Sequence, residues 1–347
     1  MLLVTFRPVG LASALASDRV FSGFVDCRKA PPAAIGLFQE AIGGATRVRI
    51  RHLQRRTIVS RMCCPLMLLW SLIAITAGLP VLGHPPESSP PQSLSSPPAV
   101  TSVRLPRAHA HNDYLHKRPL FEALELGFGS VEADVFLQGN ELRVAHTVFD
   151  LRRERTLKAL YLDPLKSWIR DHGGQIYPDG SGIWLLIDIK SDAEATYRQI
   201  HGQLEEFAEI ISSVRDGEFT ARPVTVVISG NRPVEFMRAQ RFRLAGIDGR
   251  PGDLESNDPT HLIPWISTDW KSHFRWRGAG PLPGEEQQRL AEFVSRCENQ
   301  GRQLRFWGTP DQREVWRQLW DSRVSLLGTD NLNGLARFQR EQIATEP

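Results

Sequence analysis

From residue 101 onward, short runs of apolar and β-branched residues alternate with stretches of helical periodicity, and this alternation most constrains the fold. The runs that we interpret as strands are VRLPRAHA (103–110), SVEADVFL (130–137), IWLLIDIK (183–190), VTVVISG (224–230), FRLAGIDG (242–249), LIPWIST (262–268), QLRFWG (303–308) and VSLLGTD (324–330). Most of them are separated by a helical stretch, which makes consecutive strands parallel. Eight such units close into a barrel. We therefore predict a single-domain α/β fold of the (β/α)8 TIM-barrel type over residues 101–342.

An open, doubly wound parallel sheet is the second fold that this alternation allows. A nucleotide-binding version of it would show GxGxxG or GxxxxGK[ST] after a strand, and neither motif occurs there. A further short strand, ELRVAH (141–146), is predicted between the second and third main strands. The longest predicted helix spans residues 191–214, directly after the third strand.

The N-terminal hundred residues differ in composition from the rest of the chain. Residues 63–83 carry no charge and follow a basic stretch, which is the polarity of an export signal. We predict a signal peptide over residues 62–83, with an uncleaved membrane anchor as the rival, because about 20 apolar residues span a bilayer. Residues 84–100 are mostly Pro and Ser and are predicted to be a linker. The role of residues 1–61 is unknown, and they are not translated if Met62 is the true start.

These N-terminal features predict an exported protein that is periplasmic, secreted or anchored by residues 63–83. The 42 Lys and Arg side chains are nearly balanced by 39 Asp and Glu, so bulk charge gives no support for a nucleic-acid partner. The four cysteines show no CxxC spacing, which indicates neither a zinc module nor a disulfide framework. Nothing in the composition indicates an oligomeric state. Because bulk charge and cysteine spacing indicate no class of partner, function must be sought in a site.

Polar side chains concentrate at the ends of the first three strands. In a closed barrel the functional groups lie at the carboxyl ends of the strands. The residues found there are His109, His111, Asn112, Asp113, Glu132, Asp134, His146, Asp188 and Lys190. Because strand side chains alternate between two faces, Glu132 and Asp134 share one face, and Asp188 shares a face with Lys190.

Three carboxylates that point into one apolar barrel repel each other strongly unless a cation lies between them. The candidate ligands are all oxygens and come from Asn112, Glu132, Asp134 and Asp188. Oxygen donors suit a hard cation better than zinc. Taken alone, each motif is more often a solvated strand end, but their common location favours function. We therefore predict one divalent cation, Mg²⁺ or Ca²⁺.

The ordered set of motifs resembles a known superfamily. HNDYL (111–115), the ExD of Glu132 and Asp134, His146, and the DIK that begins at Asp188 are similar to the phospholipase C-like phosphodiesterases, which include glycerophosphodiester phosphodiesterases and phosphatidylinositol-specific phospholipases C. The runs HNDY, PLFEAL, SVEADVFL, VAHT, RTLKALYLDPL, LLIDIKS and LRFWGTPD more closely resemble the group named after altered inheritance of mitochondria protein 6 and its bacterial relatives. The resemblance covers residues 104–340.

This resemblance implies a metal-dependent phosphoric diester hydrolase that acts on a small-molecule or lipid phosphodiester of the glycerophosphodiester or phospholipid type. It gives His111 and His146 the acid and base roles, assigns the metal to the four oxygen ligands named above, and places Lys190 on a phosphate oxygen. Imidazole suits either role near neutral pH, so which histidine is the acid stays open. Glycerophosphodiesterases have His-Arg where this chain has His111 and Asn112, so the head group stays open as well.

Two other functions remain as alternatives. His109-Ala-His111 also matches the HxH that begins metal-dependent amidohydrolase barrels, with Asp330 as a final ligand, but strands five and six do not end in the histidines that this class needs, and His261 precedes its strand. A non-catalytic barrel that binds a phosphorylated ligand at the cell surface is the second alternative. The retained pair His111 and His146 argues against it, because binding alone needs no acid and base.

Two further substrate contacts are predicted. His109 is interpreted as an inward neighbour of His111 that touches the substrate. Four tryptophans in the second half of the barrel either belong to the core or form a rim around its mouth: Trp265, Trp270, Trp276 and Trp307. A rim would hold a lipid tail or stack on a ring, with Trp307 as a substrate contact, and would bring the protein against a membrane surface.

Overall fold

The computed structural model describes residues 103–345. The predictions for the extension (1–61), the signal or anchor (62–83) and the linker (84–100) lie outside these residues. Among the helices between residues 103 and 345, none is both long enough and apolar enough to cross a membrane.

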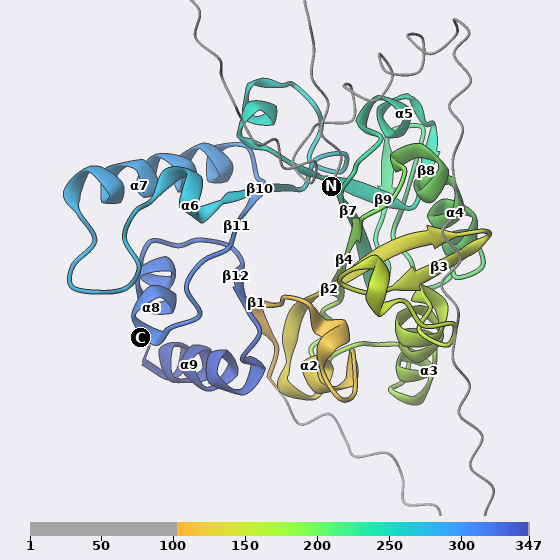
Figure 1. Cartoon of the computed structure of the whole chain (residues 1–347), viewed down its shortest axis with the longest axis horizontal. Helices are drawn as coiled ribbons and strands as arrows, with labels where there is room; N and C mark the ends of the chain where they lie inside the picture. The colour runs from red at the N-terminus through yellow and green to blue at the C-terminus, as the bar shows by residue number, and fades with distance from the viewer. Residues whose placement is uncertain (1–102, 346–347) are drawn as a thin grey trace, which may run out of the picture. The chain divides into compact units, whose positions relative to one another are not determined.

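Eight parallel strands form a barrel within the described residues. In the order of their pairing they are β1 (Leu105–Ala110), β2 (Phe128–Gln138), β4 (Ile183–Ile189), β7 (Val224–Gly230), β9 (Ala245–Gly249), β10 (Trp265–Asp269), β11 (Gln303–Trp307) and β12 (Leu327–Thr329). β12 pairs with β1, and a parallel bridge between Arg305 and Leu326 joins β11 to the start of β12. The strands surround a common centre with the helices outside them (Figure 1). The predicted barrel is thus confirmed, and the ring closure excludes the open sheet.

Helices follow most of the strands and cover the outside of the barrel (Figure 1). They are α2 (Phe121–Leu126), α3 (Asp163–Asp171), α4 (Ala193–Glu205), α5 (Val234–Ala239), α6 (Trp270–His273), α7 (Gly284–Asn299), α8 (Arg313–Asp321) and α9 (Leu332–Thr345). Short helical turns are η1 (Asp113–Leu115), η2 (Val148–Asp150), η3 (Lys158–Leu162) and η4 (Pro251–Glu255).

The helix predicted over residues 191–214 is shorter than its apolar spacing suggests. α4 ends at Glu205, Ile211 forms a bridge with Val224 at the start of β7, and the chain continues as β5 (Ser213–Arg215). β5 pairs with β6 (Glu218–Thr220) and with β8 (Phe242–Arg243) in a small antiparallel sheet. The strand predicted over 242–249 is therefore divided between β8 and β9. Tertiary pairing overrides local helical periodicity here.

The two faces of the barrel strands have different partners. The outward side chains of β2 and β4, including Val131, Ala133, Leu185 and Ile187, belong to the main apolar core together with side chains of the helices. The inward side chains form a smaller apolar cluster at the amino-terminal half of the barrel: Leu186, Val227, Trp265 and Leu326, with Trp184 packed against it. Leu186 lies one strand period before Asp188, so this cluster lies beneath the polar groups at the carboxyl ends.

Candidate active site

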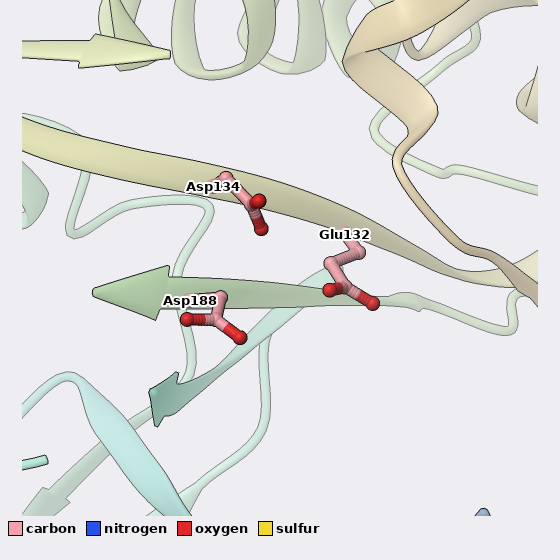
Figure 2. A group of neighbouring side chains, drawn as sticks. All are labelled: Glu132, Asp134 and Asp188. Atoms are coloured by element: carbon pink, nitrogen blue, oxygen red, sulfur yellow. The ribbon is translucent and has the colours of Figure 1, made fainter. Parts of the chain in front are cut away.

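Three carboxylates converge at the carboxyl ends of β2 and β4 (Figure 2). The two strands pair in register, with Asp134 opposite Asp188, and Glu132 precedes Asp134 by one strand period on the same face. Ligand oxygens from the three residues lie within 4.8 Å of one another. The inward grouping predicted from strand parity is present in the structure, since all three side chains point to one region in Figure 2.

This carboxylate group has the properties of a cation site. Asp134 Oδ1 is buried and accepts no hydrogen bond from any described residue. Burial raises the pKa of Asp188 to about 6, and burial together with the charge of Glu132 raises the pKa of Asp134. Among residues 103–345, Lys190 supplies the ammonium that lies between them, with Nζ 3.2 Å from Asp134 Oδ2 and 3.1 Å from Asp188 Oδ1. Oxygen ligands with too little positive charge around them fit a hard cation.

The space beside Asp188 depends on a glycine. Gly230, at the end of β7, has a φ of 67°, and a Cβ built on it would lie 2.1 Å from Asp188 Oδ1. Only glycine accepts this combination of a left-handed backbone and a close neighbour without strain. The end of β7 thus leaves room for the Asp188 carboxylate and for whatever that carboxylate binds.

Two buried side chains, His109 and Arg305, hold Glu132 in position. Its Oε2 accepts hydrogen bonds from His109 Nε2, at 2.9 Å, and from the Arg305 guanidinium. Burial acts to raise the pKa of Glu132, but the charge of Arg305 and the hydrogen bond from His109 outweigh it, so the pKa lies well below its usual value. Oε1 has no hydrogen-bond donor among residues 103–345, and therefore one oxygen of an ionised carboxylate stays free.

His109 serves this carboxylate and has little access to substrate. The side chain is fully buried, and its Nδ1 lies 2.7 Å from Ser130 Oγ. Burial and the nearby Arg305 charge lower the pKa of His109 to about 4, so its ring is neutral near pH 7. Because a carboxylate only accepts hydrogen bonds, the proton lies on Nε2. In this arrangement His109 orients Glu132. The predicted contact between His109 and substrate is not supported by the structure, because the His109 side chain has no exposed surface.

His111 is paired with an acid from the last strand. Its Nδ1 donates to Asp330 Oδ1 at 2.8 Å, and Asp330 follows β12. Burial acts to lower the pKa of His111, but the hydrogen bond and charge of Asp330 raise it above its usual value overall. The same hydrogen bond lowers the pKa of Asp330. Nδ1 is therefore occupied, and Nε2 is the ring atom left to exchange a proton.

The Tyr114 hydroxyl connects the second histidine to the carboxylates. The hydroxyl oxygen lies 2.8 Å from Asn112 Oδ1, 2.7 Å from Asp134 Oδ2 and 3.2 Å from His146 Nδ1. Asn112 adopts a left-handed φ of 48°, which turns the chain from β1 into η1 and brings Tyr114 back over the barrel. His146 follows β3 (Glu141–Val144), which pairs with β2, and its side chain is 58% exposed. The structure therefore brings Asn112 and His146 together at Asp134.

Two participants were not singled out in the sequence. Arg305 lies in β11 and contacts Glu132 across the barrel. Strand parity could have indicated this inward position, because Arg305 lies two residues before Trp307 and therefore on the same face of the strand. Tyr114 belongs to the HNDYL motif, but its role needed the fold. The sequence indicates Asp330 only as the final ligand of the amidohydrolase alternative, whereas in the structure its carboxylate accepts a hydrogen bond from His111. In the structure His109 is hydrogen-bonded to Glu132, and His111 to Asp330.

The tryptophans divide between the core and the mouth. Trp265 and Trp270 are fully buried and Trp276 is 8% exposed, so these three belong to the core and a tryptophan rim is not formed. Trp307 is partly exposed and lines a pocket of about 340 Å³ with His111 and Asp330. Lys271 and Arg277 also line this pocket, which gives it a basic wall beside His111.

Sequence comparisons relate this chain to one group of proteins. Residues 99–179 match the family model described as AIM6-like phosphodiesterase domain. An altered inheritance of mitochondria protein 6 of Saccharomyces cerevisiae is 35% identical, with 65% of this chain and 68% of the relative covered. A homologue of that protein from Arthroderma benhamiae is 29% identical, with 65% of this chain and 81% of the relative covered.

Two solved structures are similar to this chain at low identity. A glycerophosphodiester phosphodiesterase from Parabacteroides distasonis is 16% identical with a TM-score of 0.41, covering 68% of this chain and 98% of that one. A calcium-dependent phosphoinositol-specific phospholipase C from Pseudomonas is 11% identical with a TM-score of 0.45, covering 65% and 88%. The assignment of the barrel fold to this chain rests on its own strand pairing.

Proposed function

The chain belongs to the altered inheritance of mitochondria protein 6 family, and from this premise we propose that its barrel is a metal-dependent phosphoric diester hydrolase. The observation that carries the proposal is the carboxylate group of Glu132, Asp134 and Asp188 with the two histidine sites beside it. His146 reaches the group through Asp134, and His111 immediately precedes Asn112, whose side chain shares the Tyr114 hydroxyl with Asp134.

One divalent cation, Mg²⁺ or Ca²⁺, would be held by Glu132, Asp134 and Asp188, with Asn112 as the fourth protein ligand. When bound, the cation supplies positive charge that neutralises the phosphodiester and the charge that develops on it. The free oxygens of Asp134 and Glu132 support this assignment. His109 and Arg305 keep Glu132 ionised and fixed in position.

The remaining residues move protons and hold the phosphate. Asp330 keeps the Nδ1 proton of His111 in place and raises its pKa, which suits His111 to begin protonated and to deliver a proton from Nε2 to the departing alkoxide. His146, more exposed, accepts the proton of the attacking hydroxyl. Lys190 contacts two carboxylate oxygens and has a third N–H donor for a phosphate oxygen. The attacking group is water or a neighbouring hydroxyl of the substrate.

The substrate is a small-molecule or lipid phosphodiester whose head group enters the pocket beside His111. Trp307 offers a flat apolar surface there, while Lys271 and Arg277 favour a polar or anionic head group. From the sequence we also propose that residues 62–83 direct export of the protein. We further propose that it has no nucleic-acid partner.

Hydrolysis of bis(p-nitrophenyl) phosphate tests the proposal most directly. We expect turnover that requires Mg²⁺ or Ca²⁺, stops with chelator, and falls by about 10²–10⁴-fold in His111→Ala and in His146→Ala. His172→Gln is the matched control, because His172 lies at the end of α3 with its Nδ1 bonded to Trp168 O. If chelator has no effect and both alanine variants keep full turnover, the proposal is wrong. Phosphate-ester binding without any turnover would support the non-catalytic alternative.

A further inference from the structure

Large apolar side chains are exposed in a small number of places within residues 103–345. They are Val103, Leu115, Val148, Phe149 and Phe219. Three of them lie in two loops at the carboxyl end of the barrel: Leu115 is 64% exposed, Val148 53% and Phe149 88%. Isolated exposed apolar residues are normal, but a group of them on neighbouring loops marks an interaction surface. We call the segments 115–118 and 148–153 the loop rim.

The two segments of the loop rim are held next to each other and next to the active site. The guanidinium of Arg155 donates to the carbonyl oxygen of Tyr114, which joins the loop after β3 to the loop after β1. The Tyr114 hydroxyl lies 3.2 Å from His146 Nδ1, and Val148 is two residues further along the chain. The exposed apolar group therefore borders the proposed catalytic histidine.

Phe149 is presented by an ordered turn. Its backbone N–H donates to Thr147 Oγ1 at 3.3 Å, and the same hydroxyl donates to Asp150 Oδ2 at 2.6 Å. Arg152 Nη1 also donates to the carbonyl oxygens of Phe149, at 3.4 Å, and Leu151, at 3.0 Å. These bonds hold the backbone while the ring stays in solvent, so the exposure is a property of the folded turn.

Basic side chains outnumber acidic ones around the apolar group. The exposed basic residues of the loop rim are Lys117, Arg118, Arg152 and Arg153, against one carboxylate, Asp150, within it and the exposed Glu154 directly after it. Arg118 pairs with Glu125 of α2. Lys117 and Arg153 form no ion pair with any described residue. A surface with apolar side chains between unpaired cations is complementary to anionic lipid head groups above an acyl layer.

We propose that the loop rim docks on an anionic lipid bilayer and that the barrel takes its phosphodiester from a lipid of that bilayer. The second half of this statement rests on the proposed function, whereas docking does not. Phe149, Val148 and Leu115 enter the head-group region, where apolar and aromatic side chains gain burial, and the basic residues stay at the surface. Docking there brings the mouth of the barrel, with His146, against the lipid head groups.

A local fluorescence readout separates this rim from any contribution of residues 63–83. In the full chain, with Cys27, Cys63 and Cys64 replaced by serine, an environment-sensitive thiol label is attached at Phe149→Cys. Cys297 is buried, and burial raises the pKa of its thiol to about 12, so it reacts poorly with the label. Phe219→Cys is the matched control: it is 50% exposed and lies in the small sheet near the amino-terminal ends of the strands.

With vesicles of phosphatidylcholine and phosphatidylserine in equal amounts, the label at position 149 should shift to the blue and become protected from an aqueous quencher. Pure phosphatidylcholine vesicles should give a much smaller change, and the label at position 219 should not respond. The proposal is overturned if the label at position 149 does not respond to anionic vesicles, or if the labels at 149 and 219 respond equally. A label at 149 that gives no response is also the result expected if a protein partner or another part of the chain, instead of lipid, covers the rim.

Variants of the rim test affinity and separate docking from catalysis. Phe149→Ser should weaken rim docking by about tenfold, and each of Lys117→Glu and Arg153→Glu should weaken it by at least about fivefold. Turnover of soluble bis(p-nitrophenyl) phosphate should be unchanged in these variants, while turnover of a vesicle lipid falls with docking. Equal losses on both substrates would contradict a docking role. If the wild-type protein hydrolyses neither substrate, the proposed function fails, and the label at position 149 still decides docking.

Discussion

The burial of His109 predicts a specific loss of stability in mild acid. The folded protein binds a proton at this ring only near pH 4, whereas an unfolded chain binds it near pH 6.5. A depressed folded-state pKa means that the stabilising effect of the neutral ring is fully present above the unfolded pKa and is lost as the pH falls toward the folded pKa. The window therefore runs from about pH 6.5 down to about pH 4.

The size of the effect follows from the two pKa values. Between pH 7 and pH 5 the linkage relation gives a loss of about 2 kcal/mol in the free energy of unfolding from this one group. Asp113 and Asp188 act in the opposite sense over the same range, because burial raises the pKa of each to about 6 and their protonation then stabilises the fold. The informative quantity is therefore the difference between wild type and a variant without the imidazole.

His109→Gln provides that comparison, since its amide can still bond to Glu132 and Ser130. Urea unfolding of both proteins at pH 7 and pH 5, followed by far-UV circular dichroism, gives the four free energies. We expect the wild type to lose about 2 kcal/mol more than the variant between the two pH values. Parallel pH dependences in the two proteins would refute the reasoning, because His109 would then titrate alike in the folded and unfolded states.

Three other outcomes follow from the site. Arg305→Met should lower the free energy of unfolding by about 3–5 kcal/mol, because it leaves the Glu132 carboxylate buried without the guanidinium that pairs with it. In the same urea titrations, the double variant with Glu132→Gln should recover much of that loss. Gly230→Ala should weaken binding of Mg²⁺ or Ca²⁺ at least tenfold by calorimetry, since its Cβ displaces Asp188; unchanged affinity would show that Asp188 is not a ligand. Tyr114→Phe should lower kcat by about 10–100-fold with KM nearly unchanged, because the lost hydroxyl bridges two proposed ligands; a rise in KM alone would place Tyr114 in substrate binding instead.

Much of the fold follows from local pattern. Strand and helix periodicities predicted the eight strands of the barrel, because each signal lies within a few consecutive residues. The errors occur where distant pairing decides the structure: α4 stops at Glu205 because Ile211 bridges to Val224, and the run 242–249 splits because β8 joins the sheet of β5 and β6. No local pattern encodes these contacts.

The candidate site divides in the same way. Strand parity within β2 places Glu132 and Asp134 on one face, and parity within β4 does the same for Asp188 and Lys190, so the sequence alone predicts the carboxylate group that suggests a cation. Its predicted metal ligands, acids and bases stay predictions until the ion and the reaction are measured.

Only the closed barrel shows how these groups are controlled. Arg305 is 173 residues from Glu132 in the chain and Asp330 is 219 residues from His111, yet each pair shares a hydrogen bond. Periodicity determines which way a side chain points, and this is a local property of the backbone. Which charged group a side chain contacts depends on the closure of the barrel, because closure places β11 and β12 beside β1 and β2. Those contacts set the pKa values of Glu132, His109 and His111.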